Sequence, residues 1–379
     1  MKSRMSALIL AVALLAVPAA GGADERQGAT SRPAGVTYVA DEELLNELKD
    51  CPQTTVQRVE KLVALFEQAG VKDVKLQKFD AGPLKGRQNV IATLPGQEAD
   101  VIVVGAHVDF KPVGKGVVDN WSGAALMANL AQTLAQRKNT HTFVFVGFDM
   151  EELGLHGSRH YVAKLSEKER KRICAMVNLD CLGVSGMRFW PTNSADDLEA
   201  VAEKVAQQGT FKVQREEFKG ATADARAFLA AGIPAITFLG LGKSDLRVVH
   251  SAKDRFEAID RKQYSQAYRY LTAFLLALDG HQAKLTAANR EDESRPKFGF
   301  LIERQKFDEG ESVVVCLVVT GGPEEKAGMK EGDQIVEFAG VKVDKLEDFT
   351  KAALALKPRQ KVVVKVKRGQ ETISLTVQY

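Results

Sequence analysis

Short apolar runs that alternate with helical segments constrain the fold of this 379-residue chain more than any other feature. Strands buried on both faces form continuous apolar runs, and helices that cover the sheet connect parallel neighbours. We therefore expect an α/β domain with three layers, α/β/α, around a mixed, mostly parallel sheet. The runs with a strand pattern are 89–94, 101–106, 142–148, 175–179 and 235–239. The segments with a helical pattern are 42–48, 55–69, 123–136, 195–207, 223–231 and 263–278.

The two ends of the chain depart from this pattern. Lys2 and Arg4 precede a short apolar run and then small residues, an order typical of a signal peptide. We expect export to the periplasm or the medium, with no membrane anchor after cleavage. The apolar run is too short to span a bilayer, and no cysteine lies in the small residues directly after it. The expected units are a signal peptide at 1–23, the α/β domain at 36–282, a polar linker at 283–296 and a second unit at 297–379.

The composition gives no sign of a nucleic-acid partner. The formal net charge is +3, and no basic run is interleaved with aromatic residues. Cys174 and Cys181 flank one apolar segment. If that segment is extended, their separation of roughly 20 Å prevents a disulfide between them. Buried free thiols and other pairings both stay open for the four cysteines, Cys51, Cys174, Cys181 and Cys316.

Polar residues follow several of the expected strands. Ligand sites in sheets of this kind form at the carboxyl ends of the strands, so these side chains are expected to gather at one edge. Glu151 and Glu152 are adjacent carboxylates that repel each other unless a positive group lies beside them. A metal ion is the obvious candidate, with one Glu as ligand and the other for proton transfer. The candidate residues are His107, Asp109, Asp119, Glu151, Glu152, Asp180 and His250.

Each of these residues has an ordinary structural interpretation when it is taken alone. Asp119 suits the N-cap of the helix that follows, and His107 suits a hydrogen-bonded core position. Asp180 suits a strand end, and His250 a surface position. Their number and order together favour a metal centre. The other histidines are expected to be ordinary: His141, His156, His160 and His281.

The motifs that carry the candidate residues resemble the co-catalytic dizinc aminopeptidases, the family of aminopeptidase Y and the bacterial secreted leucyl aminopeptidases. The family pattern is His-x-Asp, Asp-Asn-x-Ser-Gly, Glu-Glu-x-Gly-Leu-x-Gly-Ser, Asn-Leu-Asp and a late His followed by an Asp. The glutamate motif is the most specific part. The matching segments of this chain are 107–109, 119–123, 151–158, 178–180 and 250–254.

The resemblance implies two Zn²⁺ ions per chain. Asp119 would bridge the two ions. His107 and Asp180 would complete one site, and Glu152 and His250 the other. Imidazoles and carboxylates suit zinc, and manganese or cobalt could replace it.

The resemblance also implies which residues act beside the metal ions. Glu151 would be the catalytic base, which takes a proton from metal-bound water and returns it to the leaving amine. Asp109, the second catalytic assignment, would orient His107. The family also has a cis peptide bond at its Asp-Asn motif, which predicts one between Asp119 and Asn120.

Three positions depart from the family pattern. Trp121 is bulkier than the small residue usual there, and Ala225 replaces the histidine of a Ser-Asp-His motif. Val249 stands where some relatives place an oxyanion-stabilising tyrosine. These departures concern substrate binding rather than the metal ligands. A sister family of dizinc peptidases fits less well because its bridging aspartate lies farther from the histidine, and glutaminyl cyclases share the fold with one zinc.

The C-terminal unit resembles a PDZ domain of the kind found in bacterial proteases, with one helix expected at 345–356. The most specific part is Ala-Gly-Met-x-x-Gly-Asp at 327–333. Phe298, Gly299 and Phe300 would form the loop that holds the terminal carboxylate of a peptide, and the peptide would add a strand. A packing module without a ligand is the alternative.

These interpretations together predict an exported zinc aminopeptidase that acts on peptides with a free N-terminus. Two alternatives remain open. One is a metallo-carboxypeptidase or amidohydrolase on the same core. The other is a zinc-structured scaffold of weak activity that presents its PDZ domain to a partner.

Overall fold

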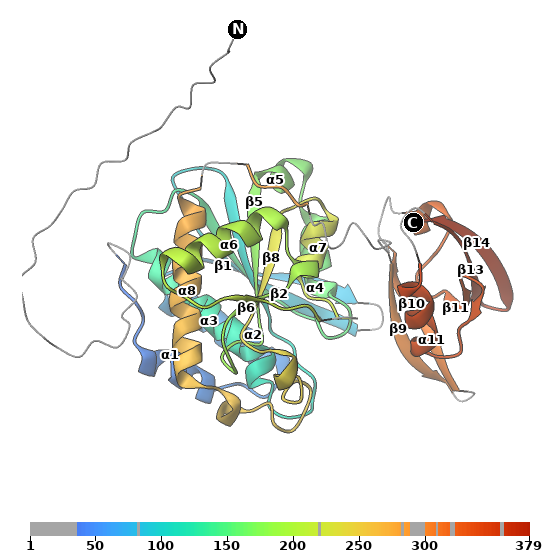
Figure 1. The fold of residues 1–379 in the computed structure, drawn as a ribbon, viewed down its shortest axis with the longest axis horizontal. Helices are drawn as coiled ribbons and strands as arrows, with labels where there is room; N and C mark the ends of the chain where they lie inside the picture. Colours follow the sequence, from blue (N-terminus) through green and yellow to red (C-terminus); the bar gives the residue numbers. More distant parts are fainter. Residues whose placement is uncertain are drawn as a thin grey trace, which may run out of the picture. The chain divides into compact units, whose positions relative to one another are not determined.

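The computed structural model describes residues 36–81, 84–218, 221–281, 284–288, 300–307, 310–318, 323–356 and 360–379. The expected signal peptide and most of the expected linker lie outside these residues. The chain contains an α/β part and a C-terminal β-rich part, each described here by itself (Figure 1). In the described segments, no helix is both long enough and apolar enough to span a membrane.

An eight-stranded sheet forms the centre of the α/β part (Figure 1). Its strands are β1 (Asp73–Ala81), β2 (Leu84–Leu94), β3 (Val101–His107), β4 (Thr142–Phe148), β5 (Ile173–Asp180), β6 (Arg188–Phe189), β7 (Gln214–Arg215) and β8 (Ala235–Leu239). Their order in the sheet is β1-β2-β4-β3-β5-β8-β6-β7. The central strands β4, β3, β5 and β8 are parallel, whereas β2 and β6 join them in antiparallel fashion. The predicted mixed, mostly parallel sheet is confirmed.

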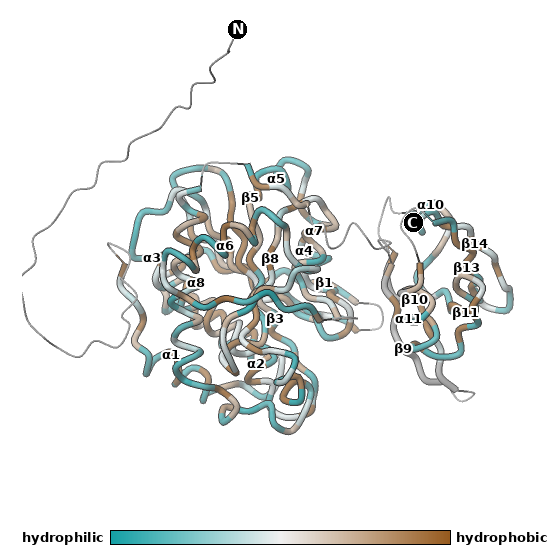
Figure 2. The backbone as a smooth tube through the Cα atoms, viewed as in Figure 1, coloured by the Kyte–Doolittle hydropathy of each residue, from teal (hydrophilic) through white to brown (hydrophobic). Residues whose placement is uncertain are grey.

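Helices cover both faces of this sheet. The larger core lies under α1 (Asp41–Lys49), α2 (Thr55–Gln68), α3 (Ser122–Ala135), α6 (Asp196–Gln208) and α8 (Arg261–Asp279). The smaller core lies under α4 (His156–Lys164) and α7 (Ala225–Ala230). Successive side chains of a strand point to opposite faces, so Val104 joins the larger core and Val103 the smaller. Figure 2 shows the central strands as mostly hydrophobic.

The apolar patterns locate the buried elements well. The six predicted helices of this part are present, each within two residues of its predicted bounds. Strand β1 was missed because most of its side chains are exposed or half-buried, so it has no continuous apolar run. Helix α5 (Glu167–Arg172) was missed because none of its residues is buried, which leaves no apolar periodicity to detect.

The C-terminal part is built on antiparallel strands around its own core. Its elements are β9 (Phe300–Phe307), β10 (Gly310–Val318), α10 (Pro323–Lys326), β11 (Gln334–Phe338), β12 (Val341–Lys342), α11 (Leu346–Leu354), β13 (Lys361–Arg368) and β14 (Glu371–Gln378). The strand order is β14-β13-β11-β10-β9, with β12 paired to β11. The rings of Phe300 and Phe338 both pack on Phe349 of α11, at centroid distances of 5.9 and 4.7 Å. The predicted helix at 345–356 is therefore confirmed as α11.

Only one residue of the predicted peptide-binding loop, Phe300, lies among the described residues. Phe298 and Gly299 lie outside the described residues. Phe300 is buried at the start of β9, and β9 is the last strand in the order of its sheet.

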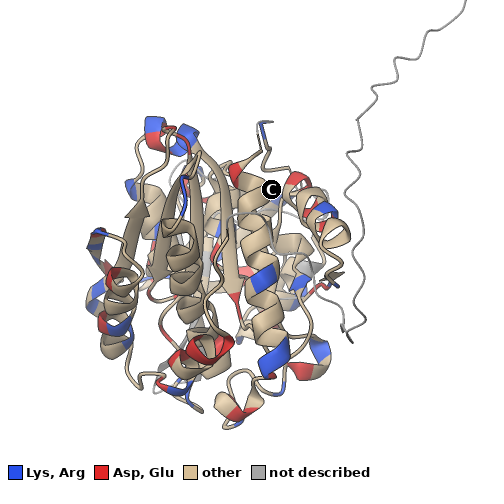
Figure 3. Cartoon of the chain, turned by 90° about the vertical axis from the view of Figure 1, so that its left-hand side faces the viewer, with Lys and Arg blue, Asp and Glu red and all other residues tan. Residues whose placement is uncertain are grey.

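The central strands β3, β4, β5 and β8 contain one Lys, Arg, Asp or Glu residue among them, Asp180 at the end of β5. Figure 3 shows most of the charged positions on loops and helices instead. Cys51, Cys174 and Cys181 are free thiols. The side chain of Cys316 lies outside the described residues.

Phe238 of β8 lies at the centre of the larger core. Its ring contacts Phe274 and Tyr270 of α8 edge-on, at centroid distances of 4.9 and 5.6 Å, and it has no exposed surface. We expect Phe238→Ala to lower the free energy of unfolding of the α/β part by about 3–5 kcal/mol, because it removes buried apolar surface and leaves a cavity.

Urea unfolding followed by tryptophan fluorescence measures this loss. Both tryptophans of the chain, Trp121 and Trp190, lie in the α/β part, so the signal reports that part alone. The exposed Leu76 of β1 provides the control, and Leu76→Ala should change the same free energy by less than about 0.5 kcal/mol. Equal losses in both variants would contradict the packing described for Phe238.

Candidate metal centre

The carboxyl edge of the central parallel strands carries the candidate ligands. β3 ends at His107 and β5 ends at Asp180, while Glu152 follows β4. Asp119 lies in η1 (Val117–Trp121), the short turn that leads into α3, and His250 lies in the loop after β8. The parallel register of these strands therefore brings together five residues that are far apart in the sequence.

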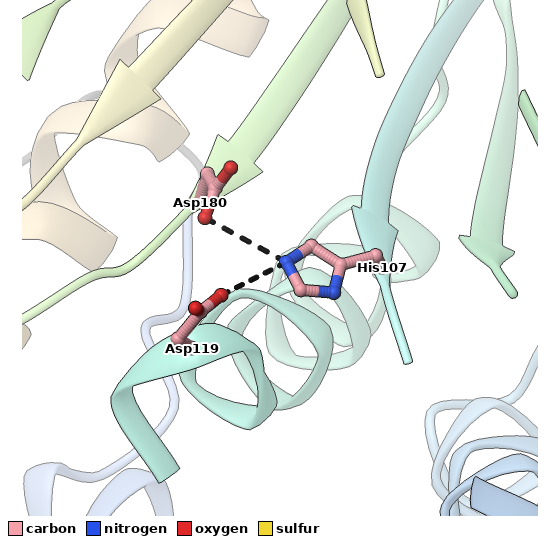
Figure 4. A group of neighbouring side chains, drawn as sticks. All are labelled: His107, Asp119 and Asp180. Carbon is pink, nitrogen blue, oxygen red and sulfur yellow. Dashed lines mark ion pairs between the residues drawn. The ribbon is translucent and has the colours of Figure 1, made fainter. Parts of the chain in front are cut away.

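The first ligand group is buried and consists of His107, Asp119 and Asp180 (Figure 4). His107 Nε2 lies 3.1 Å from Asp119 Oδ1 and 3.8 Å from Asp180 Oδ1. The imidazole of His107 is only 2% exposed. Asp180 Oδ1 is buried without a hydrogen-bond partner, which leaves a lone pair aimed into the group. A buried carboxylate oxygen without a hydrogen-bond partner is costly, and a bound cation would remove that cost.

The second ligand group shares Asp119 with the first and adds Glu152 and His250. His250 Nε2 lies 3.0 Å from Asp119 Oδ2 and 2.9 Å from Glu152 Oε2. Asp119 therefore directs one carboxylate oxygen into each group. The imidazole of His250 is 48% exposed, so the second group lies on the open side of the centre.

The donor atoms in both groups fit zinc. Each group offers one imidazole nitrogen and two carboxylates, the donor types that Zn²⁺ binds in proteins. Three protein ligands per ion would leave a coordination position for water or substrate, as catalytic zinc sites require.

Protons would compete with a bound metal ion for these donor atoms. Hydrogen bonds to Asp119 and Glu152 raise the pKa of His250 to about 10. Burial by itself would lower the pKa of His107, but the carboxylates of Asp109, Asp119 and Asp180 hold it well above its ordinary value. The two imidazoles in turn lower the pKa of Asp119, despite its burial. These shifts show how strongly the cluster of carboxylates attracts positive charge.

Asp109 holds the two adjacent glutamates in place. Its carboxylate accepts hydrogen bonds from the backbone N–H groups of Glu151 and Glu152, at 3.0 and 3.2 Å. The His107 Nδ1 atom lies 3.1 Å from the backbone carbonyl of Asp109 and 3.6 Å from its carboxylate. Asp109 thus contacts His107 mainly through its backbone oxygen, while its side chain fixes the turn that carries the glutamates.

Glu151 lies in an environment suited to a base. Burial raises the pKa of its carboxyl group well above the usual range; the charge of His107 opposes this, and Asp224 and Asp180 add to it. Asp224 is itself buried, and burial raises its pKa to about 7. The sequence indicated Asp224 only as part of an incomplete motif.

Asp254 is a positioning residue that the sequence placed after the late histidine without a role. Its carboxylate accepts hydrogen bonds from the backbone N–H groups of Val118 and Asp119, at 2.6 and 3.2 Å. It therefore ties the loop that carries His250 to the turn that carries Asp119.

Arg58 of α2 was missed by the sequence analysis. It is fully buried, and its guanidinium donates to the backbone carbonyls of Lys115 and Gly116, at 2.8 and 2.9 Å. It also lies 4.0 Å from the centre of the Phe110 ring. Arg58 therefore fixes the loop between His107 and Asp119. No motif pointed to it, because one arginine in an amphipathic helix is usually a surface residue.

The positions that depart from the family pattern pack in the core. Trp121 is fully buried, and its indole N–H donates to the carbonyl of Glu47 in α1. Ala225 begins α7 inside the smaller core. Val249 packs partly against the larger core. These surroundings explain why a bulky side chain fits at position 121.

The backbone around the ligands has unusual conformations. The peptide bond between Asp119 and Asn120 is cis, which confirms the prediction. Met150, Cys181 and His250 adopt left-handed φ angles of 65°, 48° and 52°. Such conformations are uncommon in residues other than glycine and are frequent at functional sites.

Cys181 and the other histidines lie outside the two groups. Cys181 belongs to neither of them, although it follows Asp180 directly. His141 contacts Asp279 near the amino end of β4, and His160 stacks on the ring of Phe79. Among the described residues, the other two histidines, His156 and His281, also belong to neither ligand group.

Comparison with known sequences identifies relatives of both parts. The profile of peptidase family M28 matches residues 89–275, and the profile of the PDZ domain matches residues 281–379. Aminopeptidase YwaD of Bacillus subtilis (strain 168) is 32% identical in an alignment of 187 positions that covers 46% of this chain. The match spans only 40% of the length of that relative.

Comparison with solved structures identifies the fold. LapB from Legionella pneumophila superposes with a TM-score of 0.58 and 17% sequence identity, over 64% of this chain and 73% of LapB. A glutaminyl cyclase from Bacteroides thetaiotaomicron superposes with a TM-score of 0.56 and 18% identity, over 63% of this chain and 98% of the cyclase. One fold therefore serves different named proteins, and the activity has to be argued from the site.

The sequence profiles and the fold agree with the motifs at the carboxyl edge of the sheet. All five candidate ligands lie inside the matched range 89–275. The chain therefore carries a domain of peptidase family M28, followed by a PDZ domain.

Proposed function

We propose that this protein is an exported zinc aminopeptidase that uses two metal ions. One observation carries the proposal: the two oxygens of Asp119 face separate ligand groups, 3.1 Å from His107 Nε2 and 3.0 Å from His250 Nε2. A carboxylate in this position suits a bridge between two cations. The family of the domain and the name of its Bacillus subtilis relative support peptide hydrolysis from the N-terminus. The signal-peptide pattern in residues 1–23 supports export.

The ligand groups define where the two ions would bind. His107 and Asp180 would hold one ion, Glu152 and His250 the other, and Asp119 would contribute to both. Bound zinc lowers the pKa of a coordinated water and polarises a carbonyl oxygen.

Glu151 would carry the proton during hydrolysis. Its buried carboxylate would accept a proton from the attacking water and then deliver it to the nitrogen that leaves. Burial raises the pKa of Glu151, and shifted pKa values of this kind are common among carboxylates that transfer protons in active sites. Asp109 keeps the base in register with the ligand Glu152 by binding both of their backbone N–H groups.

The substitution Glu151→Gln tests the assigned base. We expect kcat on aminoacyl-nitroanilides to fall by about 10²–10⁴-fold, because the amide cannot accept the proton. Zinc content and the unfolding midpoint should match those of the wild type, since Glu151 is not one of the expected ligands. Hydrolysis that persists unchanged in the variant would contradict this role. Cleavage of N-blocked peptides alone would instead favour the carboxypeptidase or amidohydrolase alternative.

Zinc binding to the metal-free protein should release protons. The pKa of about 10 for His250 exceeds the ordinary value of 6.5, so its imidazole holds a proton near pH 7 and must lose it to bind zinc. Proton release from His250 should fade as the pH rises through 10. Calorimetric titration at pH 7 in buffers of different ionisation enthalpy measures both the protons released and the stoichiometry, which should be two ions per chain.

Two histidine variants make this titration specific. His250→Ala should lower the stoichiometry to about one zinc ion and release fewer protons. His281→Ala removes a histidine outside both ligand groups and should leave both values as in the wild type. A stoichiometry of one in the wild type would contradict the two-ion proposal.

For the PDZ domain, we propose that it binds the C-terminus of a peptide substrate or partner. Strand β9 ends the order of its sheet, so its outer edge can pair with an added strand. The buried ring of Phe300, packed on Phe349, would anchor the start of β9 beside the carboxylate-binding loop.

Fluorescence anisotropy with a pool of labelled peptides tests this binding. We expect peptides with a free C-terminal carboxylate to bind, and the same peptides with a C-terminal amide to bind at least about tenfold more weakly, because the charged hydrogen bonds are lost. Equal binding of acid and amide forms, or no binding of either, would favour the interpretation as a packing module.

A further inference from the structure

Lys111 places a positive charge beside the second ligand group. Its Nζ donates a hydrogen bond of 2.6 Å to the backbone carbonyl of Glu152 and lies 3.5 Å from Glu152 Oε2. In the described part of the chain, it is the only Lys or Arg that forms an ion pair with a residue of either ligand group. None of the roles assigned above uses this ammonium group.

The backbone around Lys111 is fixed on both sides. On one side, the Asp109 carboxylate binds the turn of the adjacent glutamates. On the other, buried Arg58 binds the carbonyls of Lys115 and Gly116 and stacks on Phe110. Together with its hydrogen bond to the Glu152 carbonyl, this fixed backbone holds the ammonium near one position before any substrate arrives, which lowers the entropic cost of a contact with it.

Lys111 lies on the open side of the metal centre. Its side chain is 32% exposed and that of His250 is 48% exposed, whereas His107 is 2% exposed. An ammonium has three N–H donors, and the Glu152 carbonyl takes one of them. A metal ligand shares its charge with the ion, so a Glu152 bound to metal would neutralise Lys111 less than the free carboxylate does.

The charge of Lys111 also bears on how a peptide would orient. It repels the ammonium at the N-terminus of a substrate and attracts a carboxylate. It therefore favours the binding orientation in which the residues after the scissile bond lie next to Lys111. Lys111 Nζ would lie within about 6 Å of an ion bound to Glu152, given a metal–oxygen distance of about 2 Å. The residue after the scissile bond extends about 4 Å beyond the scissile carbonyl, so its carboxylate comes within reach of the ammonium.

We propose that Lys111 binds a carboxylate on the residue that follows the scissile bond, and so directs the enzyme towards dipeptides and towards peptides with an acidic second residue. This inference rests on the proposed aminopeptidase function. The carboxylate is the α-carboxylate in a dipeptide and the side chain in a longer peptide with Asp or Glu second. Lys111 is in this sense a specificity-determining residue.

Matched substrate pairs test the proposal and separate the two sources of carboxylate. Leucylglycine against its amide tests the α-carboxylate, and leucyl-aspartate amide against leucyl-asparagine amide tests the side chain. We expect the wild-type enzyme to favour the charged member of at least one pair by about tenfold in kcat/KM, as for a hydrogen bond between charged groups. In Lys111→Gln, which keeps a donor for the Glu152 carbonyl, this ratio should fall to near one.

Three variants make the result specific. Lys115→Gln removes the same charge from an exposed position of the same loop and should keep the wild-type ratio. Lys111→Arg keeps the charge and should retain most of the preference. Zinc content measured for each variant separates a lost substrate contact from a lost ion. A ratio that is the same in Lys111→Gln as in the wild type, or is near one in the wild type, would overturn the proposal.

Binding measurements keep this test independent of catalysis. Calorimetry with the zinc-loaded Glu151→Gln variant, with and without Lys111→Gln, should show tighter binding of the charged members only when Lys111 is present. If the wild type hydrolyses no pair, the aminopeptidase function fails, and these binding ratios still decide the role of Lys111. Equal binding of charged and amide forms in the presence of Lys111 would refute it.

Discussion

The shared carboxylate of Asp119 is the constraint on which the rest of the site depends. Its two oxygens each face one histidine, at 3.1 and 3.0 Å, so the positions of His107 and His250 are fixed relative to one another. One histidine ends a central strand and the other belongs to a loop after a more distant strand. This single carboxylate can therefore face both histidines only if the sheet keeps its parallel register and the loops keep their conformation.

Three neighbouring residues hold these segments in place through hydrogen bonds to backbone groups. Asp109 holds the turn of the adjacent glutamates, Asp254 holds the turn of Asp119, and Arg58 holds the loop that leads from Asp109 to that turn. None of the three belongs to the two ligand groups. Each satisfies polar groups that would otherwise be costly to bury, and each joins segments that approach only in the folded chain.

The sequence predicted the sheet centre, and it also named the five residues that the fold brings together in the two ligand groups, because both have strong local signals. Continuous apolar runs mark strands buried on both faces, and the residues after them mark the carboxyl edge. Strand β1 and helix α5 lack such signals, since they bury little apolar surface. Arg58 and Lys111 were missed for a different reason. Their partners are carbonyl groups of distant loops, and no spacing in the sequence records a contact with a backbone atom.

The residues with left-handed φ angles around the metal centre affect the stability of the protein. Met150, Cys181 and His250 each adopt a conformation that costs on the order of 1 kcal/mol in residues other than glycine. The net stability of a folded domain is only about 5–15 kcal/mol, so this strain is a noticeable fraction of it. An ion that binds only the folded chain stabilises it by mass action. The supply of metal would thereby govern resistance to unfolding and proteolysis as well as activity.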